Sequence, residues 1–116
     1  VLDAQGGPNH VGNFCGAPIM IDTDAGDVYY TPVFDVLSQF SRTIRPGDKA
    51  VQTQKTLDNL DQDDLHACAT VNGNNLLSVQ LLNTSNTAIE YNLSIETQYA
   101  QVTIPANSVQ TVQIQL

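Results

Sequence analysis

Hydrophobic residues follow two different repeats along this chain. Between Thr31 and Ile44 they recur at steps of three and four residues, which predicts a helix packed on one side. Beyond Lys49, apolar and polar residues mostly alternate in short runs, which predicts strands with one face toward a core. Pro46 and Gly47 in the segment IRPGDK stop the helix and mark the seam between the two patterns.

The predicted helix has the sequence TPVFDVLSQFSRTI. Thr31 suits the N-cap, Pro32 suits the first helical position, and Asp35 lies near the positive end of the helix dipole. Burying an apolar stripe of five side chains is worth about 10 kcal/mol, at about 2 kcal/mol each. The stripe therefore needs a partner, either the sheet that follows or a body that this chain lacks; its members are Val33, Val36, Leu37, Phe40 and Ile44.

The segment before the helix predicts a β-hairpin. PIMID and DVYY flank TDAG, in which Gly26 can take a turn position of positive φ. Asp22, Asp24 and Asp27 lie close together there, but the segment lacks the fifth-position oxygen ligand and the terminal glutamate of an EF-hand. A solvated turn is favoured over a calcium loop. The segment LDNLDQDD, with Asp58, Asp61, Asp63 and Asp64, likewise predicts an exposed acidic loop rather than a metal site.

The second half of the chain predicts an antiparallel β-sandwich. LHACATV and LLSVQLL flank NGNN, a strong hairpin signal, and NTSN turns the chain again. The next run alternates Ile89, Tyr91, Leu93 and Ile95 with polar residues, and YAQVTI and VQTVQIQL repeat the alternation around PANS. Short strands at a spacing of roughly 8–12 residues are typical of a sandwich. The fold class is therefore mainly β.

Composition limits the classes of function. The 116 residues make one domain, or one domain and a piece of another, and their net charge of −8 disfavours nucleic acid and anionic membrane surfaces as partners. No apolar run approaches the ~20 residues of a membrane span. Because the sequence opens at Val1 without a signal-peptide pattern, we expect it to begin at a boundary within a longer protein.

No catalytic constellation stands out within the chain. Cys15 and Cys68 lack the spacing of a zinc or redox motif and are interpreted as buried thiols. There is no GxSxG elbow, and His66 has no second histidine at metal-ligand spacing. The two glutamates, Glu90 and Glu96, fall in the predicted sandwich and do not suggest a paired-carboxylate site. We predict neither a cofactor nor a metal ion.

The opening LDAQGGPNHVGNFCGAPIMID, followed by YYTPVFDVLSQFSRTIRPG, resembles glycoside hydrolase family 30. This family includes lysosomal glucosylceramidase and bacterial and fungal β-glucosidases, β-xylosidases and β-1,6-glucanases. The resemblance implies that residues 1–45 are the end of the catalytic (β/α)8 barrel, with a rim loop, a hairpin and the last helix. Residues 46–116 would then be the C-terminal side β-sandwich.

The resemblance also implies where the chemistry lies. Asn13 and Phe14 match family positions closest to the sugar, as a hydrogen-bonding group and an apolar wall, although both residues can simply fix the loop. His10 is a third candidate substrate contact; animal relatives carry tryptophan there, so their aglycone preference does not transfer. The family hydrolyses β-glycosides with retention through two glutamates, both upstream of this sequence. Asp35 stands where relatives have an aromatic residue, so it must face solvent or make a different contact.

The leading interpretation is thus the C-terminal part of a retaining β-glycoside hydrolase, inactive alone and dependent on the missing barrel. The alternative is an independent carbohydrate-binding or adhesion sandwich, against which the lack of an aromatic platform speaks. A calcium-stabilised module rests only on the acidic loops. From the family we expect a secreted, periplasmic or extracellular protein, lysosomal in an animal. The sequons at Asn83 (NTS) and Asn92 (NLS) add little weight to this.

Overall fold

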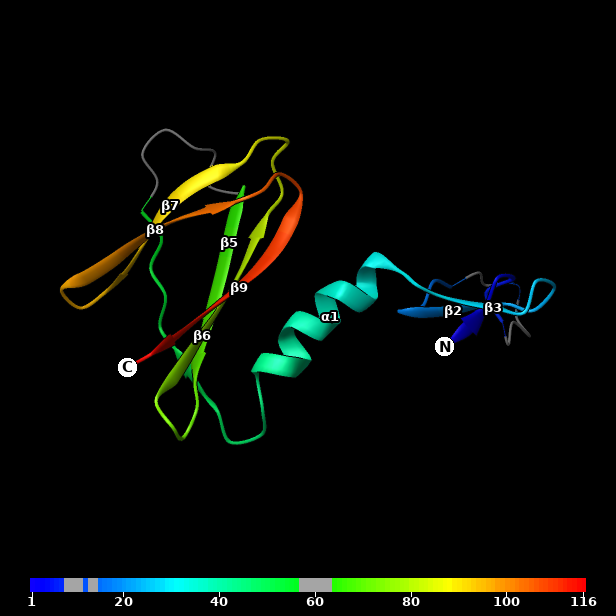
Figure 1. Cartoon of the computed structure of the whole chain (residues 1–116), viewed down its shortest axis with the longest axis horizontal. Coiled ribbons are helices and arrows are strands. Elements are labelled where there is room, and N and C mark those ends of the chain that lie inside the picture. The colour runs from blue at the N-terminus through cyan, green and yellow to red at the C-terminus, as the bar shows by residue number, and fades with distance from the viewer. Residues whose placement is uncertain (8–11, 13–14, 57–63) are drawn as a thin grey trace. The chain divides into compact units, whose positions relative to one another are not determined.

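The computed structural model describes residues 1–7, 12, 15–56 and 64–116 (Figure 1). They form two compact units, Val1–Ser41 and Arg42–Leu116. The elements, in chain order, are β1 Leu2–Asp3, β2 Ile19–Asp22, β3 Asp27–Tyr30, α1 Pro32–Thr43, β4 Lys49–Val51, β5 Leu65–Val71, β6 Leu76–Asn83, β7 Ile89–Ile95, β8 Gln98–Ile104 and β9 Ser108–Gln115.

The N-terminal unit contains the predicted hairpin. β2 and β3 pair antiparallel, and Gly26 has a φ of 75° in the turn, as its lack of a side chain allows. The Asp22 carboxylate accepts the backbone N–H groups of Asp24 and Ala25, both at 3.0 Å, so it stabilises the turn itself. The sequence analysis did not predict β1, which pairs in parallel with β2.

Helix α1 begins at Pro32, with Asp35 in its first turn, as predicted. Asp35 is exposed, which is one of the two outcomes allowed for it. Thr31 does not act as the predicted simple cap: its hydroxyl donates to the carbonyl of Ala17 at 2.8 Å and so ties the start of the helix to the segment before β2. No residue of α1 is buried. The exposed apolar residues on it are Val33, Val36, Leu37 and Phe40.

The seam after the helix is a tight turn. The N–H of Asp48 donates to the carbonyl of Arg45 at 3.0 Å, and the Asp48 carboxylate accepts the N–H of Arg45 at 2.8 Å. Gly47 has a φ of 98°, so the order Pro46-Gly47 fits the central positions of a type II turn. The predicted stop signal is confirmed.

The C-terminal unit is a two-layer sandwich (Figure 1), which confirms the predicted fold class. One layer is a four-stranded antiparallel sheet in the order β4-β5-β6-β9, and the other is the β7-β8 pair. β6 lies between β5 and β9, and Ser78 and Gln80 on its outer face are buried, whereas Leu82 is exposed. The core lies between the layers and consists of Leu65, Ala69, Leu77, Val79, Leu81, Ile89 and Ile104.

Strand β7 has the predicted alternation. Ile89 is buried, Tyr91 and Leu93 are half-buried, and Glu90 and Asn92 are exposed. The hydroxyl of Tyr91 donates to Oε1 of Gln110 at 2.8 Å across the core, and burial raises the pKa of this hydroxyl above its ordinary value. Tyr91 is thus a structural group.

Two connections cross between the sheets rather than joining paired strands. They run from β6 to β7 and from β8 to β9, and Asn83 organises both. Its Nδ2 donates to the carbonyls of Thr87 at 2.8 Å and Pro105 at 2.9 Å. Its Oδ1 accepts the N–H and the hydroxyl of Ser85 at 2.9 and 2.8 Å. Asn83 is completely buried, and its amide group holds the two crossovers together.

The predicted hairpin between β5 and β6 is confirmed. The left-handed residue of its turn is an asparagine rather than the glycine. Asn75, and not Gly73, has a positive φ, of 58°. The N–H of Asn75 donates to the carbonyl of Asn72 at 3.1 Å, and the Asn72 side chain accepts the N–H of Leu76 at 3.0 Å. A turn followed by a left-handed residue is a common hairpin geometry, and asparagine tolerates that conformation.

The interpretation of both cysteines as buried thiols is wrong. Cys15 and Cys68 are exposed, and they are not joined in a disulfide. Cys68 alternates with the core residue Ala69 along β5, so its side chain lies on the face away from the core. There its thiol donates to Oε1 of Gln80 at 3.7 Å, while Nε2 of Gln80 donates to the hydroxyl of Thr43 at 2.8 Å.

Candidate functional site: the anchored loop after β1

The three predicted substrate contacts, His10, Asn13 and Phe14, lie outside the described residues. Their roles therefore stay predictions. The same holds for most of the acidic segment, Asp58, Asp61 and Asp63. The structure instead shows how the chain on both sides of the predicted rim loop is held.

At its N-terminal end the loop is fastened by Asp3, the last residue of β1. The Asp3 carboxylate accepts the N–H groups of Gln5 at 3.0 Å and Gly7 at 2.7 Å, and the backbone of Asp3 accepts the N–H of Gly6 at 3.0 Å. Gly6 has a φ of 73°. A Cβ atom at Gly7 would lie 2.6 Å from Oδ2 of Asp3, closer than real contacts allow. Gly6 thus has a conformation that other residues rarely adopt, and a side chain at position 7 would force the Asp3 carboxylate to move.

At its C-terminal end the loop is fastened by Thr31. Besides the bond from its hydroxyl to Ala17, the N–H of Thr31 donates to the carbonyl of Pro18 at 3.0 Å. Ala17 is buried, at 6% exposure. Thr31, just before α1, and Asp3, at the end of β1, thus hold the two ends of the segment that contains Asn13 and Phe14. A loop with both ends held on regular elements is a suitable support for binding groups.

The glutamates in the sandwich do not form a glycosidase pair. Glu90 lies on β7, and Glu96 lies just beyond the end of the same strand with a φ of 52°. At ~3.3 Å per residue this separation is roughly 20 Å. The two carboxyl groups of a retaining glycosidase are about 5–5.5 Å apart. His66 is exposed on β5, and no group of three or more metal-ligating residues occurs within the described part of the chain.

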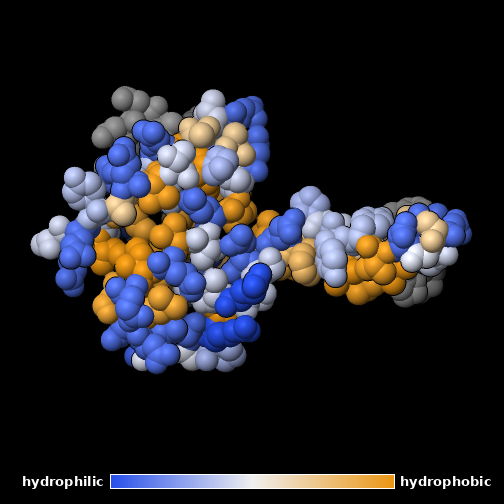
Figure 2. Space-filling view, in the orientation of Figure 1, coloured by the Kyte–Doolittle hydropathy of each residue, from blue (hydrophilic) through white to orange (hydrophobic). Residues whose placement is uncertain are grey.

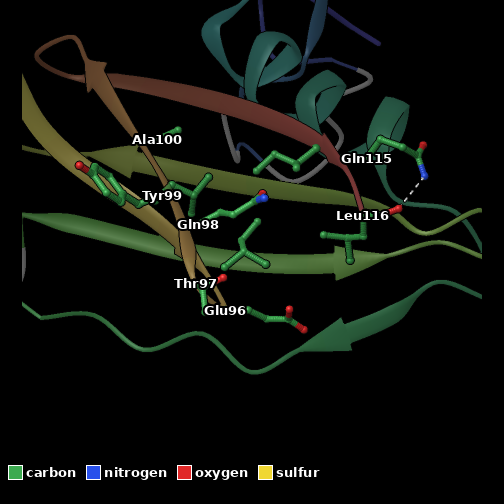
Figure 3. A pocket seen from close by; sticks show the side chains of 10 residues that line it. Glu96, Thr97, Gln98, Tyr99, Ala100, Gln115 and Leu116 are labelled. Atoms are coloured by element: carbon green, nitrogen blue, oxygen red, sulfur yellow. Dashed lines mark hydrogen bonds between the residues drawn. The ribbon is translucent and has the colours of Figure 1, made fainter.

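The sandwich contains an open cavity of about 490 Å³ between the β7-β8 hairpin and the end of β9 (Figure 3). Its lining comprises Leu93, Ile95, Glu96, Thr97, Gln98, Tyr99, Ala100, Ile114, Gln115 and Leu116. Leu93, Ile95 and Ile114 are half-buried residues that pack against the core. The cavity is therefore the incompletely filled end of the space between the two sheets, and apolar residues reach the surface of this unit in Figure 2.

The family models match nearly the whole chain. Residues 1–44 match the TIM-barrel domain of glycosyl hydrolase family 30, and residues 48–112 match the β-sandwich domain of the same family. The chain thus carries parts of two domains of one family. It belongs to glycosyl hydrolase family 30, as the resemblance of its opening segment predicted.

Curated relatives and solved structures agree with this assignment. The putative glucosylceramidases 4 and 2 of Caenorhabditis elegans are each 32% identical, over 83% and 99% of this chain respectively. The chain spans only about a fifth of their length, 20% and 22%. The crystal structure of SrfJ from Salmonella typhimurium superposes with a TM-score of 0.84 at 22% identity, over 99% of this chain and 25% of that one. The endo-β1,6-glucanase BT3312 gives 0.78 at 19% identity, over 97% and 25%. The two structures support the fold alone.

Among the described residues, no helix has the length and apolar character needed to cross a membrane.

Proposed function

We propose that this chain is the C-terminal portion of a retaining, glucosylceramidase-like β-glycoside hydrolase. In that protein, residues 1–45 complete the barrel and its substrate rim, and the sandwich of residues 46–116 braces the barrel. Names such as glucosylceramidase and endo-β1,6-glucanase among the relatives and neighbours support a β-linked glycoside or glycan as substrate.

The observation that carries the proposal is that the described residues of the N-terminal unit bury very little apolar surface. Of its described hydrophobic residues, Ala17 and Met20 are buried, at 6% and 8% exposure. Large apolar side chains are exposed instead, among them Tyr30 at 61%, Val33 at 53% and Leu37 at 52%. A segment that orders a hairpin and a helix with so little buried surface needs further structure to cover it. The remainder of a barrel would supply that cover.

The positions of the carboxylates indicate which part of the full protein carries out catalysis. The sandwich glutamates are too far apart for retaining chemistry, and the family resemblance puts the acid/base and the nucleophile upstream. Asn13 and Phe14 would contact the sugar at the rim, with His10 beside them. We propose that the chain has no catalytic residue of its own.

We expect the separate 116-residue chain to release no product from an aryl β-glycoside, while the full-length protein does. The measurement is chromophore release at matched molar concentrations, and adding the chain to the full-length protein should not raise its rate. Turnover by the chain alone would contradict the proposal. Saccharide binding by the chain alone, measured calorimetrically, would favour the alternative of an independent carbohydrate-binding module, in which Tyr99 of the sandwich, at 75% exposure, could contact a sugar.

The rim role is tested at Gly7. In the full-length protein, we expect Gly7→Ala to lower kcat/KM for a β-glycoside by about 10- to 100-fold, corresponding to about 1.4–2.7 kcal/mol. The added methyl group would displace the Asp3 carboxylate and with it the start of the loop. Gly16→Ala is the matched control, because a Cβ at Gly16 meets nothing within 4 Å. Equal activities of the two variants would contradict the rim role.

We also propose that the full protein acts outside the cytoplasm, as a secreted, periplasmic or extracellular enzyme or, in an animal, a lysosomal one. Its proposed substrates, glycans and glycosylated lipids, support this location. Fractionation of the source cells, followed by immunodetection of the protein, tests it.

A further inference from the structure

The sandwich carries two Asn-x-Ser/Thr sequons that the proposed function does not use. One begins at Asn83, with the sequence NTS, and the other at Asn92, with the sequence NLS. In the sequence they are equivalent as potential sites of N-linked glycosylation. The fold makes them different.

Asn83 has no room for a sugar. Its side chain is fully buried, at 0% exposure. Its Nδ2, the atom that would carry the glycan, donates to the carbonyl oxygens of Thr87 and Pro105 at 2.8 and 2.9 Å. An N-linked glycan replaces one of the two protons on this nitrogen and adds a bulky, hydrated group. A sugar on Asn83 would therefore break the contact that holds both crossovers and force them apart.

Asn92 has the opposite environment. It lies in the middle of β7, where Tyr91 and Leu93 face the core and Asn92 is exposed. Ser94, which supplies the sequon hydroxyl, is exposed on the same outer face. Asn92 pairs with Gln101 of β8, which is also exposed. A sugar attached to Nδ2 of Asn92 would leave the sheet into solvent without disturbing the core.

The outer face beside Asn92 also offers a packing surface. Tyr99 pairs with Ser94 in the β7-β8 register and is therefore a diagonal neighbour of Asn92. Its side chain is 75% exposed, an unusual position for a large aromatic residue. Aromatic side chains cover the apolar faces of sugar rings, so a glycan on Asn92 would shield Tyr99 from water.

We infer that Asn92 is the sequon of this chain that carries an N-linked glycan, and that Asn83 is not, when the protein passes through a pathway containing an oligosaccharyltransferase. In the transfer, Nδ2 of Asn92 bonds to the anomeric carbon of a lipid-linked oligosaccharide diphosphate. The bond from that carbon to the diphosphate oxygen breaks, the lipid diphosphate leaves with the electron pair, and the amide nitrogen loses one proton. This inference is independent of the proposed hydrolase activity.

The test is to secrete the full-length protein from a eukaryotic host and to map its glycans by peptide mass spectrometry. Treatment with an amidase that removes N-glycans should convert Asn92 to aspartate and leave Asn83 as asparagine. Asn92→Gln and Ser94→Ala should each remove this one glycan and leave the folded protein secreted. Asn83→Gln is the matched control: it should keep the glycan on Asn92 while lowering the melting temperature.

Either of two results would overturn the inference. One is a glycan on Asn83 in folded, secreted protein. The other is unmodified Asn92 in protein that has been secreted from this host. Because both readouts are made on peptides rather than on catalysis, neither depends on whether the protein hydrolyses a glycoside.

Discussion

Replacing Asn83 with alanine is expected to lower the free energy of unfolding by about 4 kcal/mol. The change removes four hydrogen bonds of a fully buried amide, worth about 1 kcal/mol each, two to carbonyl groups and two from Ser85. The affected carbonyls belong to Thr87, on the connection to β7, and to Pro105, on the connection to β9. Denaturant unfolding of the full-length protein, followed by a signal from the sandwich, measures the effect.

Asn86→Ala is the matched control for this prediction. Asn86 lies on the same crossover, but it is exposed, and the hydrogen bond that it accepts from Asn107 at 3.2 Å is also exposed. We expect its removal to change stability by less than about 0.5 kcal/mol. Similar losses for the two alanine variants would contradict the assignment of Asn83 as a buried residue that stabilises both crossovers.

The second large effect is expected on the apolar face of α1. In the full-length protein, Leu37→Asp should cost at least about 4 kcal/mol and abolish activity. About 2 kcal/mol comes from the lost burial of leucine, and the rest from burying a carboxylate without a partner. Leu37 is 52% exposed in this chain, so the size of the loss depends on a covering surface that the rest of the barrel would supply.

Ser38→Asp introduces the same charge on the other side of the helix. Ser38 lies one residue further along and is outside the apolar stripe, and its hydroxyl donates to the carbonyl of Asp35 within the helix at 2.8 Å. We expect a loss below about 1 kcal/mol, which includes weak repulsion from Asp35. If Leu37→Asp were as mild as Ser38→Asp, the stripe would be exposed in the whole protein, and the proposed barrel role of α1 would be untenable.

Local patterns predicted the helix and most of the strands, although not β1. The three- and four-residue spacing in TPVFDVLSQFSRTI predicted α1 to within one residue at each end, and Gly26 and the Pro46-Gly47 pair predicted the two turns. The alternation from Ile89 to Ile95 predicted which side chains of β7 face the core. These features depend on neighbours a few residues apart, and a sequence records such neighbours directly. The GGPN opening was specific enough to identify the family.

Only the tertiary structure decided what depends on residues far apart in the chain. The burial of Asn83 results from crossovers that bring Pro105 to it, and nothing local separates this sequon from the one at Asn92. The exposure of Cys68 follows from its place on the outer face of β5, opposite the core residue Ala69. The close contact at Gly7 comes from the Asp3 carboxylate, which folds back over it. The sequence by itself thus determined the elements, the sandwich and the family, because local periodicity and motifs specify them. The folded chain alone determined which polar groups are buried and which are free to act, because long-range packing sets their surroundings.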